Sequence, residues 1–245
     1  MQRMFRLYLL IALAFAGGCS VHAQGSTDLI ENRGQWPATV THRAITAGAT
    51  VWLERGAVLI DQFDRSALKA IAHAHTHLEI TPPNTVAHHA FRLRFLDTQA
   101  AAKVEHVGVR RGTYNYFIGN DTTRWGRNCH AFSAVVQHDV YPGIDLRFRA
   151  GDNGLKYDVI LAPGADPDWI EFTYEGAHVI GYDPQQLSIE TALGFIAERI
   201  PIAYQDIDGS RQVVTCAYRK TKNGFGFALG AYDRSIALVI DPTLI

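Results

Sequence analysis

The sequence has few cysteines, no block of basic residues and no long apolar run. Three cysteines in 245 residues exclude a small disulfide-stapled scaffold, which is far richer in cysteine. Lys and Arg number 23 against 24 Asp and Glu, and this balance excludes the basic stripe that usually marks a nucleic-acid-binding surface. The apolar run Leu7–Ala16 is shorter than the roughly 20 residues that span a membrane. We therefore expect that the protein does not bind nucleic acid and has no membrane span.

The first 23 residues have the layout of a secretory signal peptide. Arg3 and Arg6 precede the apolar run, and Val21-His22-Ala23 fits the small-x-small pattern for cleavage. Lipidation at Cys19 is the alternative, although the usual leucine of a lipoprotein box is missing. We expect export to the outside of the cell or the outer cell surface, with a periplasmic protein or a lipoprotein as the alternative.

Sequence patterns of catalysis are also missing. The chain has neither G-x-S-x-G nor H-E-x-x-H, the patterns of a nucleophile elbow and of a zinc protease. Neither Cys129 nor Cys216 lies in a catalytic motif. These two cysteines either pair or remain separate buried thiols, and the sequence leaves both readings open. We expect a non-enzyme without a cofactor.

Short strands and turns account for most of the chain. Helical periodicity is confined to Arg65–Ala74, whereas alternating apolar and polar residues recur every 8 to 12 positions. We predict an all-β, antiparallel β-sandwich of two packed halves, residues 24–100 and 101–245, with a histidine-rich insert at about 66–88. Hairpins are expected around Arg55-Gly56, Asp152-Asn153-Gly154, Asp208-Gly209 and Asn223-Gly224.

Two further strand predictions concern aromatic residues and proline. The alternation at Tyr114–Gly119 predicts a strand that is packed on both faces. Pro242 is expected to end the last strand, because proline has no N–H for the next hydrogen bond. The residues from Thr243 to Ile245 would then begin a link to a following module.

The histidine-rich insert offers a candidate metal site. His73, His75 and His77 alternate, and alternate residues of a strand share a face, so two of them could bind a metal together with His88, His89 or an acidic residue from elsewhere in the chain. A solvated polar loop is the alternative reading. Exposed aromatic rings are the other candidate site, because Trp125 or Trp169 could stack on a sugar, whereas core packing is the structural alternative.

Several phrases follow one another in a recognisable order. They are IENRGQWP (30–37), HAFRLRF (89–95), YNYFIGND (114–121), YPGIDLRF (141–148), GLKYDVILAPGADP (154–167), AYQDIDG (203–209) and LVIDPTL (238–244). Together they resemble an uncharacterised domain at the front of large secreted bacterial proteins. There it precedes β-propeller repeats of the SBBP type, or PKD-like modules and a gliding-type C-terminal sorting segment. The resemblance implies an exported β domain and assigns no catalytic residue.

Three functions remain as hypotheses. The first is a secreted or cell-surface, non-catalytic structural or interaction module, whose partners are a downstream propeller or PKD-like domain and a surface glycan or protein. The second is a carbohydrate-binding module, and the third is a metal-dependent hydrolase. Ligand, oligomeric state and the possibility of a truncated gene are not decided by the sequence.

Overall fold

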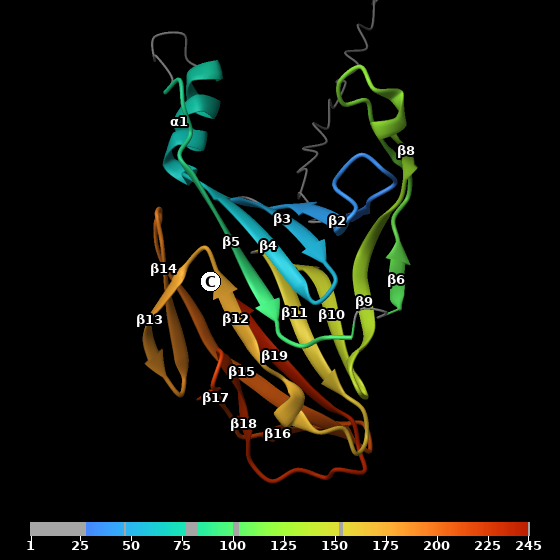
Figure 1. Cartoon of the computed structure of the whole chain (residues 1–245), viewed down its shortest axis with the longest axis vertical. Helices are drawn as coiled ribbons and strands as arrows, with labels where there is room; N and C mark the ends of the chain where they lie inside the picture. Colours follow the sequence, from blue (N-terminus) through green and yellow to red (C-terminus); the bar gives the residue numbers. More distant parts are fainter. Residues whose placement is uncertain (1–27, 47, 77–82, 100–102, 152–153, 245) are drawn as a thin grey trace, which may run out of the picture.

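The computed structural model describes residues 28–46, 48–76, 83–99, 103–151 and 154–244. These residues form an antiparallel all-β fold with one α-helix, α1 (Arg65–Thr76) (Figure 1). The prediction of an all-β sandwich with little helix is confirmed. The signal peptide and His77 lie outside the described residues. Among those described, no helix is long and apolar enough to cross a membrane.

One layer of the sandwich is built from eight strands. Its hydrogen-bonded order begins at β1 and ends at β17. The strands are β1 (Leu29–Glu31), β2 (Val40–Ile45), β3 (Ala49–Glu54), β4 (Ala57–Phe63), β5 (His88–Phe95), β12 (Phe172–Glu175), β18 (Phe225–Leu229) and β17 (Cys216–Lys220).

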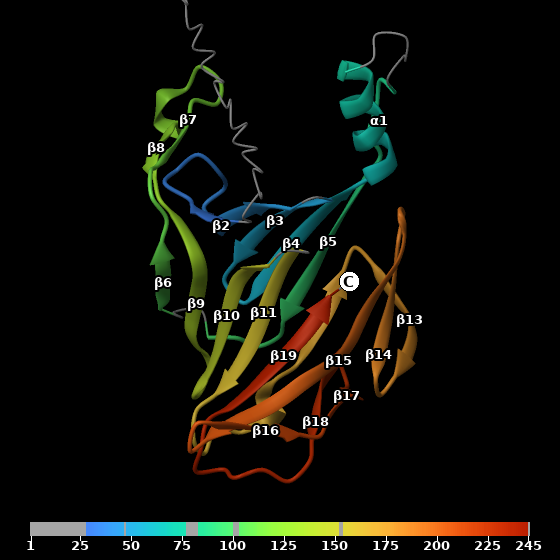
Figure 2. The ribbon, with the colours of Figure 1, turned by 180° about the vertical axis from the view of Figure 1, so that it is seen from behind.

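The second layer lies behind the first, as the two opposite views show (Figures 1 and 2). Its main order is β6–β9–β10–β11–β19–β15–β14–β13, and β16 pairs with the second half of β15. The strands are β6 (Val104–Val109), β9 (Ala131–Tyr141), β10 (Ile144–Gly151), β11 (Gly154–Leu161), β13 (His178–Asp183), β14 (Gln186–Thr191), β15 (Gly194–Ile207), β16 (Ser210–Val214) and β19 (Leu238–Leu244).

The two layers are joined at both edges. On one side β1 pairs with both β2 and β9. On the other, β16 pairs with β15, and the same stretch of chain continues as β17, which pairs with β18. The large sheet therefore closes on itself, which removes most of the unpaired edges that an open sandwich would expose.

One cluster of buried side chains fills the space between the layers. Phe95 on β5 meets Tyr157 on β11 with ring centroids 5.9 Å apart, and both belong to a cluster with members on most strands. Strands from both predicted halves contribute, since β1 pairs with β9 and β5 pairs with β12. The division of the chain near residue 100 stays a prediction.

The local elements largely follow the sequence. The helix predicted for Arg65–Ala74 is present as α1, and β3–β4, β10–β11, β15–β16 and β17–β18 are the predicted hairpins. At the β15–β16 turn Asp208 has φ 50° and Gly209 φ 76°, backbone values that Asp and Gly tolerate better than most residues.

The prediction that Pro242 ends the last strand is wrong. Strand β19 runs through Pro242 to Leu244, which pairs with Glu198. The β15–β19 register shifts between Arg199 and Ile202, so Pro242 lies at a bulge. A bulge leaves a ladder position unpaired, and a residue without an N–H is tolerated there.

Candidate functional site: an exposed aromatic hairpin

A small two-stranded sheet projects from one end of the molecule. It consists of β7 (Tyr114–Tyr116) and β8 (Gly126–Cys129), with the short 3-10 helix η1 (Thr122–Arg124) between them (Figure 1). The η1 helix starts at Asp121, whose carboxylate accepts hydrogen bonds from the backbone N–H and hydroxyl of Thr123. The indole Nε1 of Trp125 donates to the carbonyl of Gly119, so the tip has a defined conformation.

Large apolar side chains are exposed at this tip. Phe117 is 60% exposed and Ile118 50%, so the prediction of a strand packed on both faces is wrong. The strand ends at Tyr116, and the chain then turns at Gly119, where φ is 65°. Phe117 and Trp125 meet edge to face at 5.0 Å, and the Arg127 guanidinium lies 5.6 Å from the Trp125 ring centroid. We call Phe117, Ile118, Trp125 and Arg127 the hairpin patch.

The hairpin patch is held on a rigid base. Tyr116 contacts Trp36 edge to face with 5.1 Å between ring centroids, and Trp36 in turn contacts Trp52 at 5.5 Å. The guanidinium of Arg43 lies 4.9 Å from the Trp52 ring. Such aromatic and cation–π contacts each contribute on the order of 1 kcal/mol, so the body of the fold fixes how the hairpin points.

Trp169, the second aromatic candidate, is far from the first. It lies in the 3-10 helix η2 (Pro167–Trp169), which lies against β18, and β18 and β8 are near opposite ends of the long axis (Figures 1 and 2). Its ring is 55% exposed, and the neighbouring Asp168 pairs with Arg219 at 2.9 Å. Trp125 and Trp169 therefore cannot belong to one site.

The candidate histidine ligands do not converge. His73 and His75 lie in α1, where residues two apart point roughly 200° apart around the helix, so the strand spacing that would align them is absent. His89 lies on β5 and stacks on Phe91, while His88 bonds to Asp61. Within the described ranges, no group of three or more His, Cys, Asp or Glu is placed to hold a metal.

Two other histidines form contacts that the sequence did not suggest. His42 on β2 and His106 on the edge strand β6 bring their Nε2 atoms to 3.0 Å. Burial, helped by the charge on His106, lowers the pKa of His42 to about 4. On the other face of β6, Glu105 bonds to His138, which also contacts Asp145, and these hydrogen bonds raise the pKa of His138. Pairing between strands far apart in sequence creates both contacts.

A buried carboxyl group lies between the two layers. Glu198 on β15 accepts hydrogen bonds from the hydroxyls of Tyr157 on β11 and Tyr174 on β12. Burial raises the pKa of Glu198, and the two tyrosine hydroxyls only partly offset this effect. The sequence did not predict this position of Glu198, because the alternation of apolar and polar residues along β15 gives no sign that a glutamate faces inward.

The cysteines are far from any reactive arrangement. Cys129 and Cys216 are both buried free thiols, so the reading of two separate thiols is confirmed. Burial raises the pKa of Cys129, and it raises the pKa of Cys216 to about 12. A thiol with a raised pKa is a poor nucleophile, because the thiolate is the reactive form.

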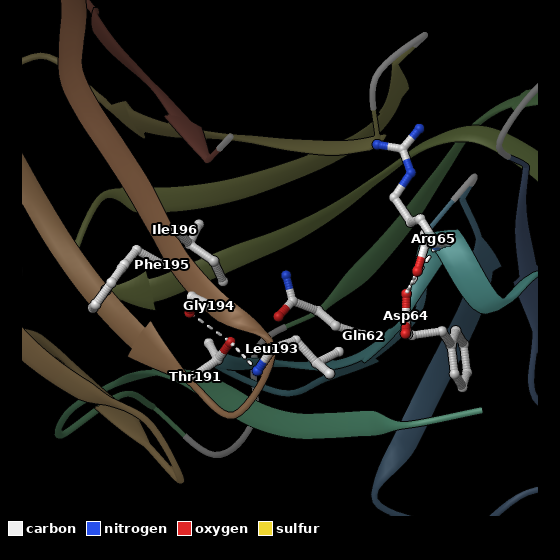
Figure 3. Close-up of a pocket in the computed structure, with 11 residues that line it drawn as sticks. Gln62, Asp64, Arg65, Thr191, Leu193, Gly194, Phe195 and Ile196 are labelled. Carbon is white, nitrogen blue, oxygen red and sulfur yellow. Dashed lines mark hydrogen bonds between the residues drawn. The ribbon is translucent and has the colours of Figure 1, made fainter. Parts of the chain in front are cut away.

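A hollow of about 430 Å³ lies between the start of α1 and the β14–β15 hairpin (Figure 3). Gln62, Asp64 and Arg65 line one side, and Gly194, Phe195 and Ile196 line the other. Gln62 reaches towards Gly194 and Ile196, whereas Phe195 points away from the hollow (Figure 3). The Asp64 carboxylate is engaged in capping α1 through the backbone N–H groups of Ser66 and Ala67.

Polar side chains in the phrases quoted from the sequence are used inside the fold. The Asn32 amide makes five hydrogen bonds with the backbone between Gly34 and Val40. Gln205 holds the segment from Asp233 to Ile236 in the same way. The Tyr141 hydroxyl reaches the carbonyls of Leu96 and Glu171. These side chains fasten loops to strands.

The fold and its surface thus define a closed, antiparallel all-β domain with an aromatic hairpin at one end. Residues 29–243 match the family described as a domain of unknown function, DUF7948. The chain belongs to this family, and the domain fills almost the whole sequence. No curated protein and no solved structure matches the chain.

Proposed function

We propose that the chain is an exported, non-catalytic structural and interaction module. It stands at the front of a larger surface protein and precedes a β-propeller or PKD-like module. The observation that carries this proposal is that polar side chains in the seven sequence segments of the resemblance form hydrogen bonds within the fold. Asn32, Tyr141 and Gln205 bond to backbone within the fold, as expected of residues that serve a scaffold.

The hairpin patch is the interaction surface of the proposed module. In this patch the exposed Phe117 packs on the partly buried Trp125 beside Arg127, and aromatic and arginine side chains are enriched in binding hot spots. The Trp36–Tyr116 contact holds the hairpin in place before binding. A partner would therefore meet a surface that loses little conformational entropy on binding.

Carbohydrate binding is the narrower form of this proposal. Trp169 favours it, because its ring is exposed beside the Asp168–Arg219 ion pair, and a sugar takes both an apolar face and polar partners. The ring pair at the hairpin patch meets edge to face at 76° and so offers no flat platform.

A glycan array with polysaccharide pull-down tests the binding role. If the hairpin patch is the binding surface, Phe117→Ala or Trp125→Ala should lower the affinity for the bound glycan or surface protein at least tenfold. Loss with Trp169→Ala alone would assign binding to η2 instead. Tyr204→Phe is the matched control, because this ring is buried beneath Arg211 on β16. Turnover of glycan or peptide substrates by the purified chain would contradict the non-catalytic role.

A further inference from the structure

The β7–β8 hairpin and the segment that leads into it are rich in arginine. From Arg110 to Arg127 the only charged residues are four arginines and one aspartate. Asp121 is engaged in capping η1, and Arg110 pairs with Asp28 at 2.9 Å. The remaining arginines are exposed and form no salt bridge within the described part of the chain; they are Arg111, Arg124 and Arg127. The hairpin is therefore a local centre of positive charge in a chain that is close to neutral overall.

The fold assembles this charge from two segments. Arg111 precedes β7 and Arg127 lies on β8, and the pairing of Tyr116 with Gly126 brings the two strands side by side. Uncharged residues separate the two groups of arginines in the sequence, so no basic block is visible there. The basic surface is a product of the folded hairpin.

Apolar and basic side chains follow one another along the hairpin. Phe117 and Ile118 lie beyond Tyr116, in the exposed loop between the two strands. Trp125 closes the same loop, and its indole N–H already has a hydrogen-bond partner there. Arg127 comes next on β8, with its guanidinium 6.0 Å from the centroid of the Phe117 ring. The tip of the hairpin is thus apolar, with arginine beside and behind it.

This order matches the layers of a lipid interface. Aromatic rings concentrate at the level of the headgroups, and an arginine can lay its stem on apolar surface while its guanidinium reaches a phosphate. We propose that the hairpin patch inserts its apolar tip into the interfacial region of an anionic lipid surface, with Arg111, Arg124 and Arg127 at the lipid phosphates. This inference rests on the proposed function, because it names the partner of the interaction surface.

The arrangement of the whole end of the molecule favours an extended surface over a single glycan or a compact protein. Helix α1 projects from the same end as the hairpin (Figures 1 and 2). It carries Arg65 and Lys69 and contains no acidic residue. A flat anionic surface can meet both projections at once, and each basic residue near such a surface adds to the attraction.

Vesicle sedimentation with the whole chain tests the proposal. Vesicles of phosphatidylcholine alone are compared with vesicles in which about one third of the lipid is phosphatidylglycerol. We expect at least about tenfold tighter binding to the anionic vesicles, and Arg111→Gln combined with Arg127→Gln should remove most of this difference. Lys220→Gln combined with Lys222→Gln removes the same charge from exposed positions of the β17–β18 hairpin. This control should leave binding within about twofold.

The apolar tip has a test of its own. Phe117→Ser combined with Ile118→Ser should weaken binding to anionic vesicles at least about tenfold, whereas Val213→Ser, at a more exposed position of β16, should not. A polarity-sensitive dye on Ile118→Cys should shift its emission to the blue on these vesicles, and the same dye on Val213→Cys should not. Cys129 and Cys216 are buried and do not compete for the dye in the folded chain. Unchanged melting temperatures confirm that the variants fold.

The outcomes separate this inference from the proposed function. It is overturned by equal binding to both vesicle types, by absence of binding to anionic vesicles, by binding that the hairpin variants retain, or by an unshifted dye at Ile118. A glycan or protein that binds the hairpin in a chain without affinity for vesicles would also overturn it, and would leave the proposed function standing. A hairpin that binds lipid, glycan and protein equally poorly would contradict both.

Discussion

At the residue scale, buried polar side chains hold the interior together. Glu198 has no basic partner among the interactions described for it, and two tyrosine hydroxyls serve it instead. Because its pKa is raised in the folded protein, folding favours the protonated carboxyl. The contribution of Glu198 to stability is therefore full below the unfolded pKa near 4.5 and is lost as the pH rises through the folded value.

Substitution of Glu198 tests this account. Glu198→Gln matches the shape of the protonated carboxyl but does not ionise. Between pH 4.5 and pH 8 the free energy of unfolding of this variant should therefore fall less than that of the wild type. Glu198→Ala should cost about 2–4 kcal/mol, since it leaves two buried hydroxyls without a partner. Urea unfolding at several pH values measures both. An unchanged pH slope in Glu198→Gln would contradict the raised pKa.

Asn32 gives a second prediction at this scale. Asn32→Ala removes five hydrogen bonds that close the loop between β1 and β2, and we expect a loss of about 2–4 kcal/mol in the free energy of unfolding. Asn120→Ala, at an exposed position of the β7–β8 hairpin, should stay within about 0.5 kcal/mol. Thermal or urea denaturation compares the two, and equal effects would argue against a loop-fastening role.

At the element scale, the edge strand β6 is held by histidine contacts on both faces. The lowered pKa of His42 means that its contribution is present above pH 6.5 and is lost as the pH falls towards 4. The raised pKa of His138 has the opposite sign, so that contribution is present below pH 6.5 and is lost as the pH rises through the folded value. Attachment of β6 should therefore be firmest near pH 6.5.

Amide exchange of β6 measures this pH dependence. Relative to amides of β3, and after correction for intrinsic exchange, amides of Val104–Val109 should lose protection both as the pH falls towards 4 and as the pH rises through the raised pKa of His138. A shift of pKa from 6.5 to about 4 corresponds to about 3 kcal/mol. His42→Phe should remove only the acid loss, and His138→Gln only the alkaline loss. A single monotonic trend in both variants would contradict the assignment.

At the scale of the whole molecule, closure of the sheet replaces covalent cross-links. Both described cysteines are buried as free thiols, and the layers are joined by β1 at one edge and by β16–β17 at the other. Addition of a reductant should therefore shift the melting temperature by less than about 1 °C. A thiol reagent should label Cys129 and Cys216 only after unfolding. A substantial fall in melting temperature under reduction would indicate a disulfide instead.

The sequence predicts those parts of the structure that are set by interactions between residues close in sequence, and it does not predict contacts between distant strands. The hairpin β3–β4 and helix α1 follow from turn residues and periodicity, which are local. The contact of His42 with His106 and the position of Glu198 depend on which strands become neighbours, and a single sequence does not carry that information. Pro242 misled the prediction because its effect depends on a bulge formed with β15. Trp125 was found as a candidate, but the exposure of its neighbour Phe117 was not.

The position of β19 has a consequence for how the chain acquires its structure. This strand lies between β11 and β15, although it follows both of them in the sequence and is therefore synthesised after them. The layer behind β2–β5 therefore stays split until residue 244 is available, and long-range strand pairing of this kind is slow. Synthesis that stops shortly before Leu238 should leave β11 and β15 with exposed edges and produce aggregates. Pairing of the seven residues of β19 is therefore the step that completes the fold.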